Sequence, residues 1–116
     1  MSKKRMPTKY ERAVKLYQKV KKPVVYYLSG DYCNPEKMCI YDGKQVREFI
    51  IFHPALLSSY TTERILAILE KIEHNRQAVI DTLKKYKDFE VLDKTTEKHL
   101  ENLIEEAKYE EALRIL

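Results

Sequence analysis

The sequence predicts an α+β fold of order α-β-β-β-α-α, and three patterns carry that prediction. Residues 8–22 open with a capping sequence and have helical periodicity, residues 23–53 are rich in β-branched and aromatic residues, and residues 62–116 return to helical spacing. We expect an N-terminal helix, a three-stranded antiparallel sheet with a tight hairpin, then a long helix and a C-terminal helix packed as an antiparallel pair. A chain of 116 residues suits one core, so we treat residues 1–116 as a single domain and residues 1–7 as a flexible basic arm.

The N-terminal helix is predicted by a capping box. In such a box the Thr8 hydroxyl accepts a hydrogen bond from the backbone N–H of Glu11, and the Glu11 carboxylate accepts one from the backbone N–H of Thr8. Pro23 marks the far end, because the residue before a proline avoids the helical region. The apolar face of this helix holds Tyr10, Ala13, Val14, Leu16, Tyr17 and Val20, and the opposite face holds Arg12, Lys15, Lys19 and Lys22.

The sheet is predicted by a short β-prone run and a turn signal. Residues 24–28 are β-branched and aromatic. Asp42-Gly43 lies between the runs 37–41 and 44–52 and is typical of a two-residue type I′ hairpin, which needs positive φ at both central positions. These runs are the expected second and third strands.

That hairpin places Lys37 opposite Glu48 and Cys39 opposite Val46. Residues 49–52 are apolar on both faces of the strand. We expect the chain's own helices to cover one face and a second subunit to cover the other, which predicts a homodimer.

The long helix is expected from about residue 62 to about residue 87, with an apolar 4-3 seam interrupted by Arg76. Arg76 either specifies the register of a helix contact or extends past the edge of the seam into solvent. Asp93 or Thr95 caps a last helix that runs to the C-terminus. The residues expected at the dimer contact are Phe49, Ile51, Ile65, Leu69, Ile72, Arg76, Val79 and Leu83.

The distribution of charge points to a polyanion as the partner. Residues 1–22 carry nine basic side chains and one acid, whereas residues 88–116 carry nine acids and four basic side chains. Such asymmetry is typical of proteins that bind nucleic acid or an acidic partner. We therefore expect a non-enzymatic protein that binds DNA or RNA through phosphate contacts. The expected contact residues are Lys3, Lys4, Arg5, Arg12, Lys15, Lys19 and Lys22.

Several alternatives stay open. The cationic face is also compatible with an ordinary solvated helix surface, or with neutralisation by the acidic C-terminal helix. The protein is alternatively an interaction module, an inhibitor or adaptor, that uses its helical hairpin or its apolar sheet face. A winged-helix arrangement is disfavoured, because residues 70–78 contain no glycine or other turn signal.

Catalytic and metal-binding patterns are missing from the sequence. It contains no nucleophile-elbow, P-loop, dinucleotide or HExxH motif, and it has only two glycines. We expect no catalytic residues, no cofactor and no metal. Cys33, Cys39 and His53 are a conceivable ligand set, but their spacing is not that of a zinc site. The loop 29–35 is either a binding loop or a plain connector.

Composition bears on the cellular location and the source of the protein. Two cysteines do not make a disulfide framework, so we expect a reducing, cytoplasmic location. The sequence has no apolar run long enough for a membrane span. Lys and Glu number 16 and 13, against three Asn and three Gln, a usage that resembles that of thermophile proteins.

Overall fold

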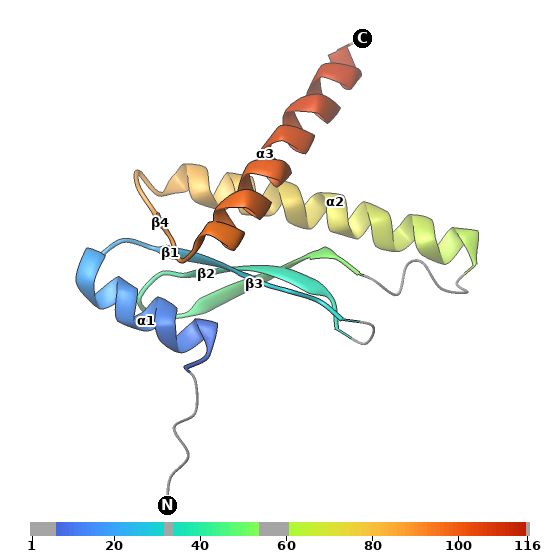
Figure 1. The fold of residues 1–116 in the computed structure, drawn as a ribbon. Coiled ribbons are helices and arrows are strands. Elements are labelled where there is room, and N and C mark those ends of the chain that lie inside the picture. The colour runs from blue at the N-terminus through green and yellow to red at the C-terminus, as the bar shows by residue number, and fades with distance from the viewer. Residues whose placement is uncertain (1–6, 32–33, 54–60, 116) are drawn as a thin grey trace, which may run out of the picture.

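A mixed β-sheet lies between helices on both of its faces in the computed structural model (Figure 1), which describes residues 7–31, 34–53 and 61–115, with side chains up to Lys108. The predicted α+β class is confirmed. The elements in chain order are α1 (Lys9–Val20), β1 (Val24–Leu28), β2 (Glu36–Tyr41), β3 (Val46–Phe52), α2 (Thr62–Lys85), β4 (Glu90–Val91) and α3 (Lys94–Ile115).

The sheet has four strands in the described part of the chain, in the order β3-β2-β1-β4, so the expectation of three antiparallel strands is corrected. β1, β2 and β3 are antiparallel as predicted, but β4 runs parallel to β1. The Glu90 N–H donates to the Pro23 carbonyl at 2.8 Å, and the Leu92 N–H donates to the Val25 carbonyl at 3.0 Å. Two paired residues are too few to show a strand periodicity, which is why the sequence indicated only a break at this point.

The hairpin between β2 and β3 is present, but its turn is longer than the sequence predicted. The carboxylate of Asp42 accepts the N–H groups of Lys44 and Gln45, both at 2.9 Å. This network makes residues 42–45 a four-residue loop, and only Gly43 within it has positive φ. A type I′ turn is therefore wrong here, because the Asp42 side chain organises a different loop.

The longer loop shifts the strand register by two residues. Cys39 lies opposite Glu48 and Lys37 lies opposite Ile50, so the predicted pairs are corrected. Lys37 and Glu48 still form an ion pair at 3.3 Å, as diagonal neighbours on the same face of the sheet.

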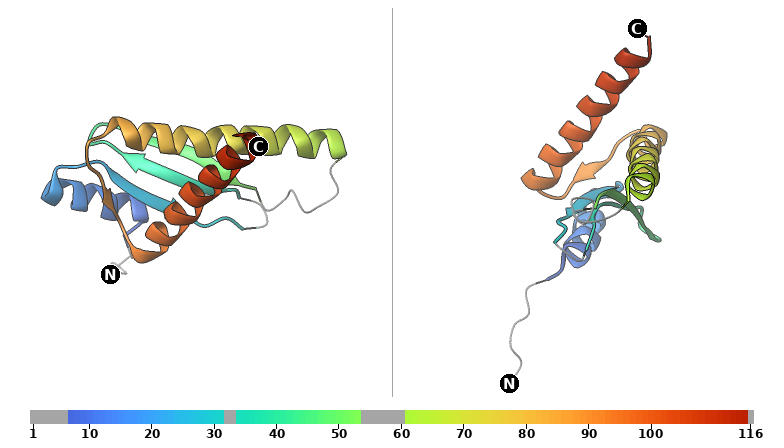
Figure 2. Two further views of the ribbon diagram at one scale, coloured as in Figure 1. Left: turned by 90° about the horizontal axis from the view of Figure 1, so that it is seen from above. Right: turned by 90° about the vertical axis from the view of Figure 1, so that its right-hand side faces the viewer.

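α1 covers one face of the sheet, and α2 and α3 cover the other (Figures 1 and 2). The smaller core beneath α1 contains Ala13, Val24, Tyr26 and Cys39. The larger core beneath α2 and α3 contains Val25, Tyr27, Met38, Ile40, Phe49, Ile51, Val79, Leu83, Leu100 and Leu103. The alternation along β1, with Val24 and Tyr26 on one face and Val25 and Tyr27 on the other, follows from the two-residue period of a strand.

The two C-terminal helices do not lie side by side as the expected antiparallel pair. α3 crosses α2 obliquely, and its C-terminal end points away from the sheet (Figure 2). The two helices contact each other in the larger core, where Val79 and Leu83 of α2 meet the cluster that holds Leu100 and Leu103 of α3, and at the ion pair between Arg76 and Glu106.

Most of the apolar residues that were expected at a dimer contact belong to the chain's own core. Phe49, Ile51, Ile72, Val79 and Leu83 are buried inside the molecule. The inward face of β3 is thus covered by α2 without a second subunit, which corrects the assignment of these five residues to a surface. Ile65 is half-buried and Leu69 is exposed. The homodimer itself stays a prediction.

In the parts of the chain that the structure describes, every helix is too short or too polar to cross a membrane.

Candidate nucleic-acid interface on the first helix

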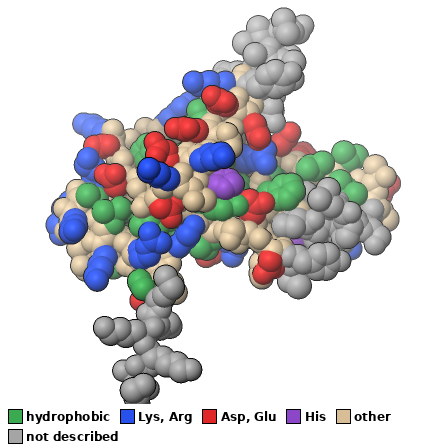
Figure 3. Space-filling model, viewed as in Figure 1, with side chains coloured by type: hydrophobic (Ala, Val, Ile, Leu, Met, Phe, Trp, Pro, Cys, Tyr) green, Lys and Arg blue, Asp and Glu red, His purple; other side chains and the backbone are tan. Residues whose placement is uncertain are grey.

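The outer side of α1 presents a cationic surface, which we define as Arg12, Lys15 and Lys19. All three side chains are exposed, and in the space-filling view Lys and Arg side chains lie over α1 at the lower left (Figure 3). None of the three forms an ion pair with a carboxylate among the described residues. They follow i, i+3 and i+7 spacing, so they share one side of the helix over about 10 Å of its axis.

The helix that carries this surface is held in place at both ends. The Thr8 hydroxyl accepts the Glu11 N–H at 3.1 Å, which confirms the predicted N-cap. At the other end Lys21 adopts a left-handed conformation and its N–H donates to the Tyr17 carbonyl at 2.8 Å. The helix therefore ends at Val20, before the boundary that Pro23 imposes.

Lys22 differs from the other predicted contact residues. Its ammonium lies 2.8 Å from the Asp88 carboxylate. The hydrogen bond between them raises the pKa of Lys22 and lowers that of Asp88. Lys22 already has a carboxylate partner, and we leave it out of the cationic surface.

Lys9 is a basic residue of α1 whose role sequence reasoning did not identify. Its ammonium donates to the Tyr27 carbonyl, lies 3.8 Å from the Asp93 carboxylate and sits 5.5 Å from the centre of the Tyr27 ring. Lys9 therefore points toward the sheet and α3, and it contributes to folding rather than to the outer surface. The one signal in the sequence was that Lys9 falls on the apolar side of the helix, between Leu16 and Val20 at 100° per residue.

The acidic C-terminal helix does not cover the cationic surface. α1 and the body of α3 lie on opposite faces of the sheet (Figures 1 and 2), and the described acids of α3 form no ion pair with α1. The two charged segments contact each other at the Lys22–Asp88 ion pair and at Asp93, both before α3 begins. Burial acts to raise the pKa of Asp93, but hydrogen bonds from Thr96 and the nearby charges of Lys9 and Arg12 outweigh it, so the pKa is lowered.

The tyrosines of α1 pack toward the hairpin. Tyr17 is half-buried, and its ring meets Tyr41 edge to face at 5.4 Å. Tyr10 is 48% exposed and lies 5.9 Å from the same Tyr41 ring. Tyr17 is thus part of the packing, and Tyr10 is the one tyrosine of α1 with a largely open surface.

The other predicted contact residues, Lys3, Lys4 and Arg5, lie outside the described residues.

Arg76 makes its described contacts within the chain, where it connects α2 to β3 and to α3. Its Nε donates to the Ile51 carbonyl at 3.0 Å, and its guanidinium pairs with Glu106 at 2.5 Å. The neighbouring Asn75 donates to the Ile50 carbonyl at 3.0 Å. α2 therefore supplies two side-chain donors to carbonyls of β3, an edge strand of the sheet.

The conceivable metal-ligand set of Cys33, Cys39 and His53 receives no support from the described geometry. Among the described residues, no group of three His, Cys, Asp or Glu side chains is arranged to hold a metal ion. Cys33 lies outside the described residues. Burial raises the pKa of the Cys39 thiol to about 12. Because the thiolate is the reactive species, Cys39 behaves as a small buried core residue.

Comparisons of the chain with protein-family models, with curated proteins and with solved structures find no match.

Proposed function

We propose that this protein binds nucleic acid through phosphate contacts made by the cationic surface of α1. The observation that carries the proposal is that Arg12, Lys15 and Lys19 are exposed together and form no ion pair with a carboxylate among the described residues, the nearest effect being that of the Arg12 charge on Asp93. A polyanion gains by contact with such a surface, because each phosphate that is neutralised releases condensed counterions. The position of α3 on the other side of the sheet supports the proposal, since its acids do not compete.

The proposed binding has little dependence on base sequence. Phosphate contacts position a protein on nucleic acid but do not read its bases. Arg12, Lys15 and Lys19 extend from the solvent side of a helix whose opposite side is packed on the sheet. We infer that the surface recognises the backbone, with Lys3, Lys4 and Arg5 as an additional arm.

The test is the salt dependence of binding to labelled duplex and single-stranded oligonucleotides, measured by fluorescence anisotropy. The variant R12Q/K15Q/K19Q removes the cationic surface. For duplex DNA the slope of log K against log salt becomes shallower by about 0.9 for each phosphate that the protein no longer neutralises, so we expect a change of about 2 to 3. The variant R12Q/K15Q/K19Q keeps the core intact, because the three side chains are exposed.

The matched control is K71Q/K84Q/K98Q. These three lysines are exposed on α2 and α3, at the other face of the sheet, and their removal changes the net charge by the same amount. We expect the control to keep the wild-type slope within about one unit. An equal effect in both variants would show a general charge effect and contradict a contact at α1, as would the absence of binding by the wild type at low salt.

A second function is supported by a different observation. Leu66 and Leu69 of α2 are 60% and 43% exposed, and adjacent exposed leucines on one helix are typical of a protein contact. We propose, as the alternative, a protein-interaction module that uses this part of α2. Two results together would favour this alternative: the wild type does not bind nucleic acid, and the variant L66S/L69S no longer binds a protein partner that the wild type binds.

A further inference from the structure

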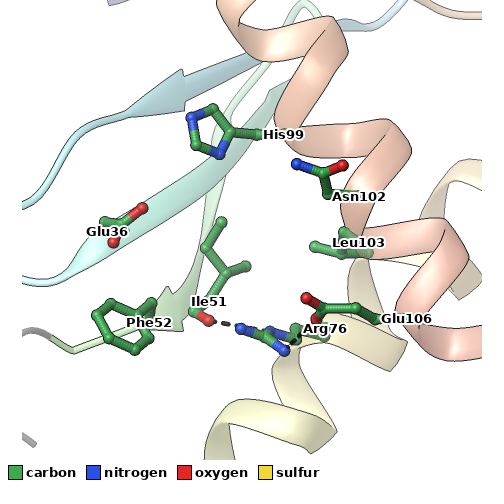
Figure 4. A pocket seen from close by; sticks show the side chains of 8 residues that line it. All are labelled: Glu36, Ile51, Phe52, Arg76, His99, Asn102, Leu103 and Glu106. Carbon is green, nitrogen blue, oxygen red and sulfur yellow. Dashed lines mark hydrogen bonds and ion pairs between the residues drawn. The ribbon is translucent and has the colours of Figure 1, made fainter. Parts of the chain in front are cut away.

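A pocket lies on the sheet face that carries α2 and α3, at the end where β2 begins and β3 ends. It encloses about 260 Å³. Figure 4 shows the side chains that line it: Glu36, Ile51, Phe52, Arg76, His99, Asn102, Leu103 and Glu106. Four elements thus contribute to one site, and the residues come from positions that are far apart in the sequence.

The polar wall of the pocket is rich in acceptors. Glu36 and Glu106 lie on opposite sides of it in Figure 4. Glu36 accepts the Tyr27 hydroxyl with Oε1, and Glu106 pairs with Arg76 through Oε2. The second oxygen of each carboxylate has no partner among the described residues. Both remain able to accept from a ligand.

The groups that form this wall are held in place by their own contacts. The His99 ring stacks on the Tyr27 ring with centres 3.7 Å apart and planes 10° from parallel. Tyr27 in turn donates to Glu36. Arg76 is held by the Ile51 carbonyl and by Glu106. Since these side chains already have partners within the chain, the pocket needs little rearrangement to accept a ligand.

The charge of the pocket excludes one class of ligand. Two carboxylates, one guanidinium and the His99 imidazole line it. With the imidazole counted as neutral, this leaves an excess of one negative charge, and the guanidinium is already paired with Glu106. Phosphates and carboxylates are therefore repelled. A cation is attracted by the excess charge and by the aromatic ring of Phe52.

We propose that this pocket binds a primary ammonium group on an alkyl chain. The free oxygens of Glu36 and Glu106 accept from the ammonium, which has three donors. The methylenes of the ligand lie against the apolar lining residues Ile51, Phe52 and Leu103. This chemistry occurs in free diamines and in the lysine side chain of a second polypeptide. The inference does not depend on the proposed contact at α1, which lies on the other face of the sheet.

The test is a calorimetric titration at low salt with two probes, 1,5-diaminopentane and Nα-acetyl-lysine N-methylamide. We expect saturable binding of at least one probe in the millimolar range or tighter. Binding of the diamine alone assigns the site to free amines, and binding of the lysine derivative alone assigns it to a protein side chain. The neutral isostere 1,5-pentanediol should not bind, because it lacks the charge.

The variants E36Q and E106Q should each weaken binding by about fivefold or more. E105Q is the matched control, because Glu105 is an exposed neighbour on α3 that does not line the pocket; its affinity should stay within twofold of wild type. Glu106 is itself exposed, so E106Q remains informative if E36Q disturbs folding. Three results would each overturn the proposal: no saturable binding of either probe, equal binding of pentanediol, or full affinity in both E36Q and E106Q.

Discussion

The Lys9 ammonium at the start of α1 lies 3.8 Å from the carboxylate of Asp93, the residue that precedes α3. Lys9 also donates to the Tyr27 carbonyl of β1. One side chain thus connects the first helix, the central sheet and the last helix. Because the body of α3 is on the other face of the sheet from α1, the basic and acidic segments of the chain meet at this contact and at the Lys22–Asp88 ion pair.

Replacing Lys9 with methionine should destabilise the fold. The change keeps the length of the side chain but removes the Lys9 donor from the Tyr27 carbonyl and the Lys9 charge from beside the Asp93 carboxylate. We expect a decrease of about 1 to 2 kcal/mol in the free energy of unfolding, measured by urea denaturation. K15M is the control, since Lys15 is exposed and has no described partner. Equal stability of the two variants would contradict the role assigned to Lys9.

Asp93 should make stability depend on pH in the acid range. Its pKa in the folded protein lies below the ordinary value of 3.8. The folded state therefore favours the ionised carboxylate, and this contribution is fully present above pH 3.8 and is lost as pH falls through the lower folded pKa. The variant D93N should be less stable than wild type at pH 7, and the difference should shrink on acidification below about pH 4. Unfolding free energies at several pH values check this, and a difference that grows toward low pH would contradict it.

The buried hydroxyl of Thr96 should contribute more to the free energy of unfolding than the hydroxyl of the neighbouring Thr95. Thr96 is fully buried, and its hydroxyl accepts the Tyr27 N–H at 3.0 Å. β4 is too short to reach Tyr27, so Thr96 replaces the strand partner at this position. T96V should cost about 1 to 3 kcal/mol, because a buried N–H loses its acceptor without a change of shape. Urea denaturation, with faster hydrogen exchange at the Tyr27 amide, is the measurement.

The control for this experiment is T95V, since Thr95 is exposed. It should change the free energy of unfolding by no more than about 0.5 kcal/mol. A Tyr27 amide that exchanges equally slowly in T96V would show that the hydroxyl is not its acceptor.

Gly43 should tolerate no side chain. Its φ is +94°, and a Cβ at this position would overlap the ring of Tyr17. G43A should therefore cost about 2 kcal/mol or more, from left-handed strain together with overpacking. The double variant Y17A/G43A should show a smaller cost of the alanine at position 43 than the wild-type background does, because the overlap is gone. K44A, at the exposed neighbour, is the control for the loop, and additive costs in the cycle would contradict the overlap.

Local patterns were sufficient for the helices. The capping box of Thr8 and Glu11 predicted the start of α1, and the heptad seam predicted α2 to within two residues of its end. Each signal depends on residues that are close in sequence, which is why a single sequence is enough to show it. The exposed positions of Arg12, Lys15 and Lys19 followed from the same periodicity.

The strand register could not be predicted from local sequence patterns. The Asp-Gly signal located the hairpin, but the hydrogen bonds from Lys44 and Gln45 to the Asp42 carboxylate decided its length. A two-residue change in the loop altered every cross-strand pair, including those of Cys39 and Lys37. Side-chain hydrogen bonds within a turn compete with the backbone pattern, and the sequence does not show which arrangement prevails.

The sequence by itself determined the amphipathic helices, the β-rich segment and the uneven distribution of charge, because each is a property of neighbouring residues. Only the tertiary structure decided that Lys9 points inward, that Lys22 pairs with Asp88 and that α3 leaves the surface of α1 uncovered. It also brought Glu36 and Glu106 to one pocket. These relationships join residues that are distant along the chain, and packing of the helices on opposite faces of the sheet sets the distances between them.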